Sequence, residues 1–249
     1  VTAVQVGDRV VYTGRPADSY SEHRNFDANQ LVPIPDEISD EQAAALFLKG
    51  LTAWYLLNKS YSVQPGDNIL LHAAAGGVGL IACQWARHIG AKVIGVVSTE
   101  EKAELARAHG CSNILMADQN IAEKVLEITN DEGVAAVYDS IGKDTFISSL
   151  DSLKPHGVMV TFGNASGPVD PFAPSELASR HSLYVTRPIL ADFINTRGKL
   201  LNASQALFDL VIKKVIKISI NQRYALRDTA QAHRDLESRK TTGSTILTP

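Results

Sequence analysis

The stretch LLHAAAGGVGLIACQWARHIGAKVIGVVSTEEK, residues 70–102, decides the fold class. The apolar run at 68–73 predicts a short buried strand, and apolar residues at helical spacing over 80–89 predict a helix that ends at Gly90. A second apolar run at 92–97 predicts another strand. Strand, turn, helix and strand in this order predict a βαβ unit.

The turn inside this unit is rich in residues without bulky side chains. Ala74-Ala75-Gly76-Gly77-Val78-Gly79 has the A-x-G-x-x-G form of a dinucleotide-binding turn, with Ala74 in place of the first glycine. Gly76 would let backbone approach a pyrophosphate, and Gly79 would let the helix pack closely on the strand. The helix N-terminus would offer free N–H groups to the phosphates. A tight turn in some other α/β domain is the alternative, but the two flanking strands favour a dinucleotide.

The end of the second strand carries information on the cofactor. An NAD site usually has an acidic residue here, whereas this chain has Ser98 followed by Thr99. We interpret Glu100 and Glu101 as first-turn helix acids, with Ser98 and Glu101 as a possible capping box. Lys102 follows at a place where its ammonium could meet a 2′-phosphate. A solvated helix lysine is the alternative, but the missing acid and Lys102 together favour NADP over NAD.

Further strands and helices alternate along the chain. Strands are predicted at 113–116, 135–139 and 158–162, and helices at 100–109, 122–129 and 145–153. This alternation predicts an α/β fold with a parallel sheet covered by helices. Outside it, we expect strands at 9–12, 31–33 and 244–247, a helix beginning at Asp40 and another at 200–211.

Composition excludes several classes of protein. The 249 residues are 45% hydrophobic and carry a net charge of -3, which gives no basic surface for nucleic acid. No apolar run is long enough to span a membrane, and the N-terminus does not resemble a signal peptide. The two cysteines, Cys83 and Cys111, make no disulfide framework and no four-thiolate zinc site. We expect a reducing, cytoplasmic setting.

Two residue patterns are set aside. Tyr55 and Lys59 have the Tyr-x-x-x-Lys spacing of short-chain dehydrogenases, but they precede the glycine turn, so we interpret them as helix surface. The seven histidines show no paired ligand spacing, and His72 is expected to be a hydrogen-bonded residue at a strand end.

Seven segments together resemble one known family. They are GDRVVY (7–12), KGLTAWYLL (49–57), HAAAGGVGLIACQWA (72–86), VYDSIG (137–142), TFGNASG (161–167), SLYVTRP (182–188) and LESRKTTGSTILTP (236–249). They occur in order along the chain and resemble the zinc-independent quinone oxidoreductases, relatives of zeta-crystallin in the medium-chain dehydrogenase/reductase superfamily. The resemblance implies a Rossmann doubly wound parallel sheet with helices on both faces, plus remnants of a GroES-like β-barrel catalytic domain.

The resemblance also implies a division into domains. Residues 1–49 would be the C-terminal part of the GroES-like domain, 50–183 the dinucleotide-binding domain, and 184–249 a return to the catalytic domain. The family carries a longer catalytic domain ahead of GDRV, so this chain would lack most of it. We therefore expect these residues to bind NADPH and to reduce quinones slowly.

The cofactor-binding residues implied by the resemblance are Thr52, Ala75, Gly76, Gly77, Val78, Ser98, Lys102, Ser140, Phe162, Gly163, Asn164, Ser166, Leu190 and Arg239. Taken alone, Thr52 could be an ordinary helix hydroxyl, Ser140 a cap, the residues from 162 to 166 a plain turn, and Arg239 a solvated arginine. The family often has a tyrosine near 116–117 for the adenosine phosphate. Here Met116, Ala117 and Asp118 stand instead, which weakens the NADPH preference.

The implied activity is NADPH-dependent reduction of quinones or other electron-poor acceptors without metal, by a homodimer. No catalytic side chain and no metal ligand is assigned. The segment 13–29 contains no cysteine, which excludes the structural zinc of zinc-dependent relatives. An enone or 2-enoyl-thioester reductase and a non-catalytic, crystallin-like NADPH-binding protein are the alternatives.

Overall fold

The computed structural model describes residues 3–14, 19–238 and 241–249, and the chain divides into two units. One unit is Tyr55–Ile189, and the other joins Val1–Trp54 to Leu190–Pro249. The sequence predicted domain boundaries at 49/50 and 183/184.

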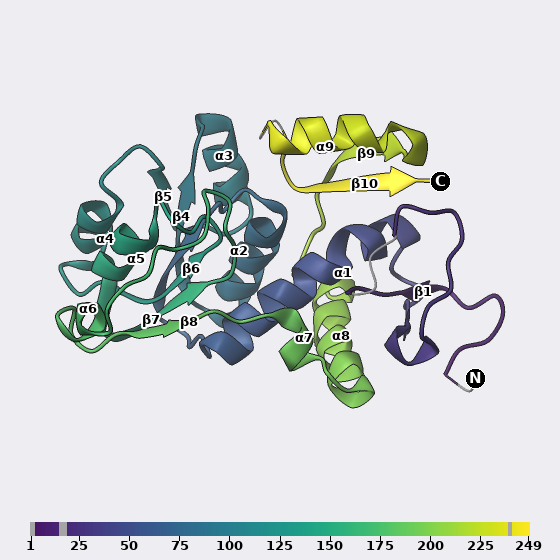
Figure 1. The fold of residues 1–249 in the computed structure, drawn as a ribbon, viewed down its shortest axis with the longest axis horizontal. Coiled ribbons are helices and arrows are strands. Elements are labelled where there is room, and N and C mark those ends of the chain that lie inside the picture. The colour runs from purple at the N-terminus through teal and green to yellow at the C-terminus, as the bar shows by residue number, and fades with distance from the viewer. Residues whose placement is uncertain (1–2, 15–18, 239–240) are drawn as a thin grey trace. The chain divides into compact units, whose positions relative to one another are not determined.

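The unit Tyr55–Ile189 is built on a six-stranded sheet in which every pair of neighbours is parallel (Figure 1). Its order is β5-β4-β3-β6-β7-β8, so the strand order reverses between β3 and β6. The prediction of a doubly wound parallel sheet is confirmed. The strands are β3 (Asn68–His72), β4 (Lys92–Val97), β5 (Asn113–Met116), β6 (Val134–Asp139), β7 (Leu153–Thr161) and β8 (Tyr184–Thr186).

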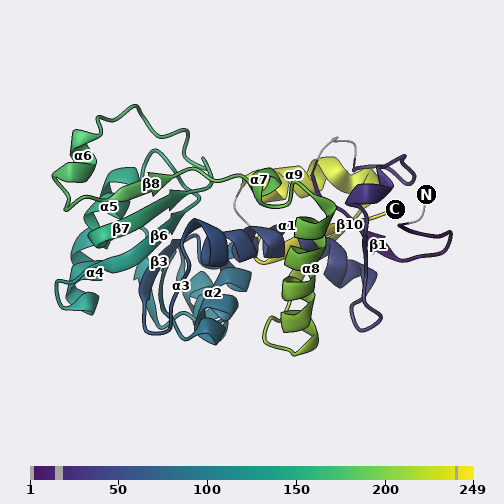
Figure 2. The ribbon, with the colours of Figure 1, turned by 90° about the horizontal axis from the view of Figure 1, so that it is seen from below.

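Helices cover both faces of this sheet. Figure 2 shows α2 (Gly77–Ile89) and α3 (Glu100–Ala108) on one face, and α4 (Ile121–Thr129) and α5 (Phe146–Asp151) on the other. The short α6 (Ser175–Ala178) precedes β8. Leu70, Ile94, Val137 and Met159 are buried in the core, as expected for strands covered on both sides. Together these layers place the carboxyl ends of the strands at one edge, where the loops to the helices begin.

The helix ends follow the local sequence, with one correction. Gly90 ends α2 in the left-handed region at φ 98°, a conformation that suits glycine. The predicted capping box of Ser98 and Glu101 is wrong, because Thr99 is the N-cap of α3 and its hydroxyl accepts from the backbone N–H of Lys102. Thr99 sits one residue later, where the backbone has left the strand and is still extended.

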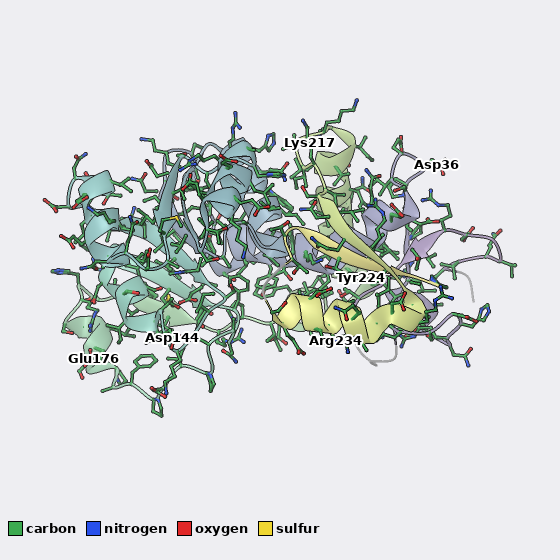
Figure 3. All side chains as sticks on the ribbon, turned by 90° about the horizontal axis from the view of Figure 1, so that it is seen from above. Asp36, Asp144, Glu176, Lys217, Tyr224 and Arg234 are labelled. Carbon is green, nitrogen blue, oxygen red and sulfur yellow. The ribbon has the colours of Figure 1, made fainter. Side chains whose placement is uncertain are left out.

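The described residues of the other unit form two small sheets and three longer helices. β1 (Val10–Val11) pairs antiparallel with β2 (Val32–Pro33), and β9 (Ile220–Ala225) pairs parallel with β10 (Ser244–Thr248). The helices are α1 (Asp40–Tyr55), α8 (Arg197–Ile212) and α9 (Thr229–Glu237), with shorter turns at α7 (Leu190–Phe193), η1 (Ala28–Gln30) and η3 (Leu226–Asp228). The Tyr224 hydroxyl donates to Asp235 Oδ2 at 2.8 Å, which joins β9 to α9; Tyr224 is labelled in Figure 3.

Tyr55 departs from its predicted place on a helix surface. It is the last residue of α1 and is buried, and a π-helical turn, η2 (Leu56–Ser60), follows it. Burial raises the pKa of the Tyr55 phenol to about 12. Lys59, in contrast, is exposed as expected.

Candidate functional site

The glycine turn lies at the carboxyl end of β3, where the strand order reverses. Gly76 is the N-cap of α2, and no side chain caps this helix end. The first N–H groups of a helix have no acceptor within the helix, so they are available to an anion. A Cβ on Gly79 would lie 2.6 Å from the carbonyl oxygen of Ala74, so only glycine allows the helix to start this close to the strand. Ala75, Gly76, Gly77 and Val78 form the predicted turn.

Ser98 and Lys102 come together at the end of the neighbouring strand β4. β4 is paired with β3 in parallel, with Val96 opposite His72. The Lys102 ammonium donates to Ser98 Oγ at 3.3 Å, because Ser98 follows the strand directly and Lys102 lies in the first turn of α3. A hydroxyl and an ammonium therefore point to the same place beside the glycine turn. This pair has the chemistry to hold a phosphate monoester.

The predicted residues after β6 and β7 also meet at this edge. The backbone N–H of Ala165 donates to the Ser140 carbonyl at 3.2 Å. The backbone N–H of Ser166 donates to the Ile141 carbonyl at 2.8 Å, and its hydroxyl donates to the same carbonyl at 3.0 Å. A Cβ on Gly163 would run into the backbone of Ser140. The turn at 140–142 and the loop at 162–167 are thus packed together.

Asp139 shapes this pair of loops, and the sequence did not single it out. It is the last residue of β6 and has no exposed surface. Its Oδ1 accepts from the backbone N–H groups of Ile141 and Gly142 at 2.7 and 3.1 Å, and its Oδ2 accepts from Thr145 Oγ1 at 2.7 Å. An acid at the end of an apolar strand, before Ser-Ile-Gly, was the available signal for such a turn.

His72 occupies the place that the sequence predicted. It ends β3, is buried, and its Nε2 lies 3.0 Å from Ser149 Oγ, so the prediction of a hydrogen-bonded strand-end histidine is confirmed. Burial lowers the pKa of His72, and the charge of Asp139 opposes that shift.

Two predicted cofactor residues, Thr52 and Leu190, lie outside this unit. Thr52 is in α1, where its hydroxyl donates to the Leu48 carbonyl at 2.8 Å, as an ordinary helix hydroxyl does. Leu190 is the first residue of α7 and is partly buried. Arg239 lies outside the described residues.

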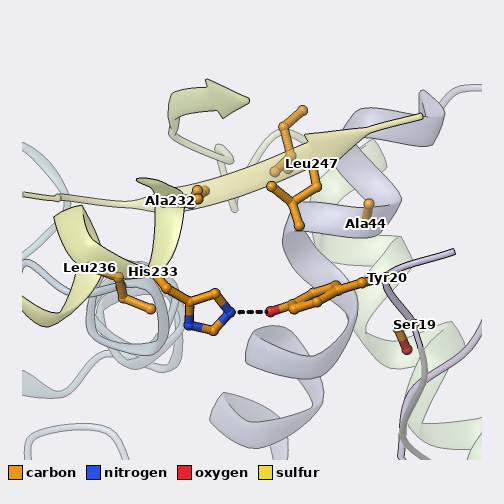
Figure 4. Close-up of a pocket in the computed structure, with 9 residues that line it drawn as sticks. Ser19, Tyr20, Ala44, Ala232, His233, Leu236 and Leu247 are labelled. Carbon is orange, nitrogen blue, oxygen red and sulfur yellow. Dashed lines mark hydrogen bonds between the residues drawn. The ribbon is translucent and has the colours of Figure 1, made fainter. Parts of the chain in front are cut away.

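Each unit also contains a cavity. One of about 290 Å³ lies at the carboxyl end of β7 and is lined by Phe146, Thr161, Asn164, Pro168, Val169, Phe172, Val185 and Arg187. The other, of about 330 Å³, is in the unit that contains α9 (Figure 4). Tyr20 lines it, with its hydroxyl 3.0 Å from Nε2 of His233.

The described part of the chain contains neither a metal-binding cluster nor a membrane-spanning helix. No group of three or more His, Cys, Asp and Glu side chains is arranged to hold a metal ion within residues 3–14, 19–238 and 241–249. Over the same ranges, no helix has the length and apolar character needed to cross a bilayer.

The parallel sheet, the uncapped glycine turn at its switch point and the loops beside it define a Rossmann-type nucleotide-binding domain. Residues 77–205 match the family described as zinc-binding dehydrogenase. A quinone oxidoreductase of Pseudomonas aeruginosa is 50% identical over the whole of this chain and 77% of its own length. A 2-haloacrylate reductase of a Burkholderia species is 46% identical over the whole chain and 76% of its own length.

Solved structures agree with this match. The Escherichia coli quinone oxidoreductase complexed with NADPH superposes with a TM-score of 0.97 at 47% identity, over all of this chain and 77% of that one. The chain belongs to the quinone oxidoreductase family of the medium-chain dehydrogenase/reductase superfamily.

Proposed function

We propose that this protein binds NADPH and transfers its reducing equivalents to quinones. The observation that carries the proposal is the Ser98–Lys102 pair at the end of β4, beside an uncapped glycine turn. An acidic residue at this place would select the ribose 2′-hydroxyl of NAD, whereas a hydroxyl and an ammonium favour a 2′-phosphate. The E. coli relative is described as complexed with NADPH, which supports this choice.

The order of the strands supports binding of the cofactor in an extended form across this edge. Ser98 and Lys102 would hold the 2′-phosphate, and the first N–H groups of α2 would face the pyrophosphate. Since β4, β3, β6 and β7 lie in this order, a cofactor with its adenosine at β4 and its pyrophosphate at β3 would extend over β6 and β7. Ser140 and the residues Phe162, Gly163, Asn164 and Ser166 lie there.

The chemistry needs little from the side chains. NADPH, when bound, supplies the hydride, and a quinone that accepts it takes one proton from solvent to become a hydroquinone. The protein would fix the position of the cofactor and exclude water from it. No metal enters this proposal, since the acceptor is already electron-poor and needs no Lewis acid.

The test compares acceptors under identical conditions, with a chelator present. NADPH oxidation is followed at its absorbance band with 1,4-benzoquinone and with a 2-enoyl thioester. We expect the quinone to be reduced faster than the thioester, one per NADPH consumed. Oxidation of NADPH by neither acceptor, with tight binding retained, would identify a non-catalytic NADPH-binding protein.

One alternative has an observation of its own. The relative that is 46% identical is named a 2-haloacrylate reductase, and a haloacrylate is an electron-poor alkene rather than a quinone. The same scaffold would then reduce a conjugated double bond. A faster rate with 2-chloroacrylate or the thioester than with any quinone would favour this function.

We further infer a homodimer in the cytoplasm. Among the described residues, β8 is an edge strand with exposed Tyr184, and such an edge offers unpaired backbone groups to a second copy. The thiols of Cys83 and Cys111 are free although their sulfurs lie 3.2 Å apart, which fits a reducing compartment. Sedimentation of the protein with Val185→Pro on this edge tests the dimer.

A further inference from the structure

A chain of buried hydrogen bonds runs beneath the edge that carries the proposed NADPH site. It begins at His72, whose Nε2 lies 3.0 Å from Ser149 Oγ, and continues from Ser149 Oγ to Asp139 Oδ2 at 3.2 Å. Less than 3% of each of these three residues is exposed. Because Ser149 donates its one hydroxyl hydrogen to Asp139, it accepts from His72, which therefore donates through Nε2.

This hydrogen-bonded chain ends at backbone groups of the proposed NADPH site. The other oxygen of Asp139 accepts from the N–H groups of Ile141 and Gly142, so the carboxylate fixes the turn that begins at Ser140. Gly142 adopts φ 96° and forms a parallel bridge with Gly167. The loop at 162–167 is thereby tied to the same turn. The backbone N–H of Asp144, a residue labelled in Figure 3, donates to Ser166 Oγ at 3.1 Å and adds a further hydrogen bond to this loop.

We propose that His72, Ser149 and Asp139 are positioning residues that hold the turn at 140–142 for the nicotinamide riboside half of the cofactor. This inference rests on the proposed NADPH site. The adenosine half would bind at β4 and the pyrophosphate at β3, away from this turn. His72 is the last residue of β3, two residues before the glycine turn begins at Ala74, so the hydrogen-bonded chain links the strand that carries the pyrophosphate turn to the loops of the other half.

A comparison of two ligands tests the proposal. NADPH contains both halves, whereas 2′-phosphoadenosine 5′-diphosphate keeps the adenosine and the pyrophosphate and lacks the whole nicotinamide riboside. Ser149→Ala removes the link while leaving Asp139 three hydrogen bonds. We expect this variant to bind NADPH about tenfold more weakly, which corresponds to about 1.4 kcal/mol, and to bind the fragment as the wild type does. The ratio of the two dissociation constants is the readout, because general loosening of the domain would weaken both ligands together.

Two variants of His72 distinguish the loss of its hydrogen-bond donor from a general loss of stability. His72→Gln keeps an amide N–H near the place of Nε2 and should preserve the wild-type ratio, whereas His72→Leu removes the donor and should shift the ratio as Ser149→Ala does. The matched control is Thr129→Val. Its buried hydroxyl also links a helix to the residue before a strand, donating to the Val125 carbonyl and accepting from the Gly133 N–H, but it lies near the amino end of β6. It should lower the melting temperature and leave the ratio unchanged.

The outcomes separate this inference from the function on which it rests. A wild-type protein that does not bind NADPH would refute both. If the wild type binds NADPH and Ser149→Ala or His72→Leu weakens both ligands equally, or neither, the three residues are structural only and the inference is wrong. Equal ratios for His72→Gln and His72→Leu would also refute it, because the donor would then have no role.

Discussion

Replacement of Lys102 by alanine removes the ammonium that lies 3.3 Å from Ser98 Oγ. In the proposed complex both groups contact the 2′-phosphate, so the variant should lose affinity for NADPH and keep its affinity for NADH. A charge-assisted contact of this kind contributes about 1.5–3 kcal/mol. The side chain of Lys102 is partly exposed, so water and salt screen it, and we expect the lower half of that range.

That free energy corresponds to a loss of about 10- to 40-fold in NADPH affinity. Fluorescence titration of the reduced nicotinamide measures both cofactors under one set of conditions. Lys92→Ala is the matched control, because Lys92 is exposed at the opposite end of the same strand and should leave both affinities unchanged. The loss for NADPH should shrink as salt is raised. Equal losses for NADPH and NADH in Lys102→Ala would refute the assignment of this pair to the 2′-phosphate.

Three other changes test the turn and its surroundings. Gly77→Val places a branched side chain on the first residue of α2, so NADPH binding should collapse in a titration while the circular dichroism spectrum of the fold persists; normal binding would show that Gly77 does not line the site. Gly79→Ala forces a Cβ against the carbonyl of Ala74 and should cost about 1–3 kcal/mol in the free energy of unfolding by urea, whereas Gly198→Ala, with nothing within 4 Å, should cost nothing. The folded-state pKa of His72 is lowered, so the contribution of this residue to stability is complete above its unfolded-state pKa of about 6.5 and falls as the pH drops below that value. His72→Gln should therefore flatten the wild-type fall in melting temperature between pH 7.5 and 5.5. An unchanged fall in this variant would contradict the lowered pKa of His72.

The sequence predicted the sheet because its strands are long apolar runs separated by helical periods. The strands beginning near Asn68, Lys92 and Asn113 were placed to within a residue or two. The glycine turn was visible for the same reason, since Gly76 and Gly79 have roles that follow from the absence of a side chain. Ser98 and Lys102 could be assigned from the sequence because their roles depend only on where the preceding strand ends.

Other elements gave weaker signals. β8 was missed because the run around Tyr184 has only three residues in the strand. β9 and α9 were missed because Ile220–Ala225 mixes polar and apolar residues and the helix that follows is mostly exposed. Tyr55 was misplaced because a spacing pattern says nothing of tertiary packing.

The hydrogen-bonded chain could not be found from the sequence. His72 ends β3 and Ser149 lies on α5, 77 residues away in the sequence. They meet because α5 follows β6, which is the neighbour of β3 in the sheet. The sequence also does not show that the Asp139 carboxylate is buried, or that its Oδ1 accepts from backbone N–H groups of its own turn.

Calorimetric titration of the protein with NADPH and with NADH, in the presence of a chelator, tests the central claim most directly. The account predicts one NADPH per chain, a dissociation constant at least tenfold lower for NADPH than for NADH, and no effect of the chelator. Absence of NADPH binding, or equal affinity for the two cofactors, would contradict it.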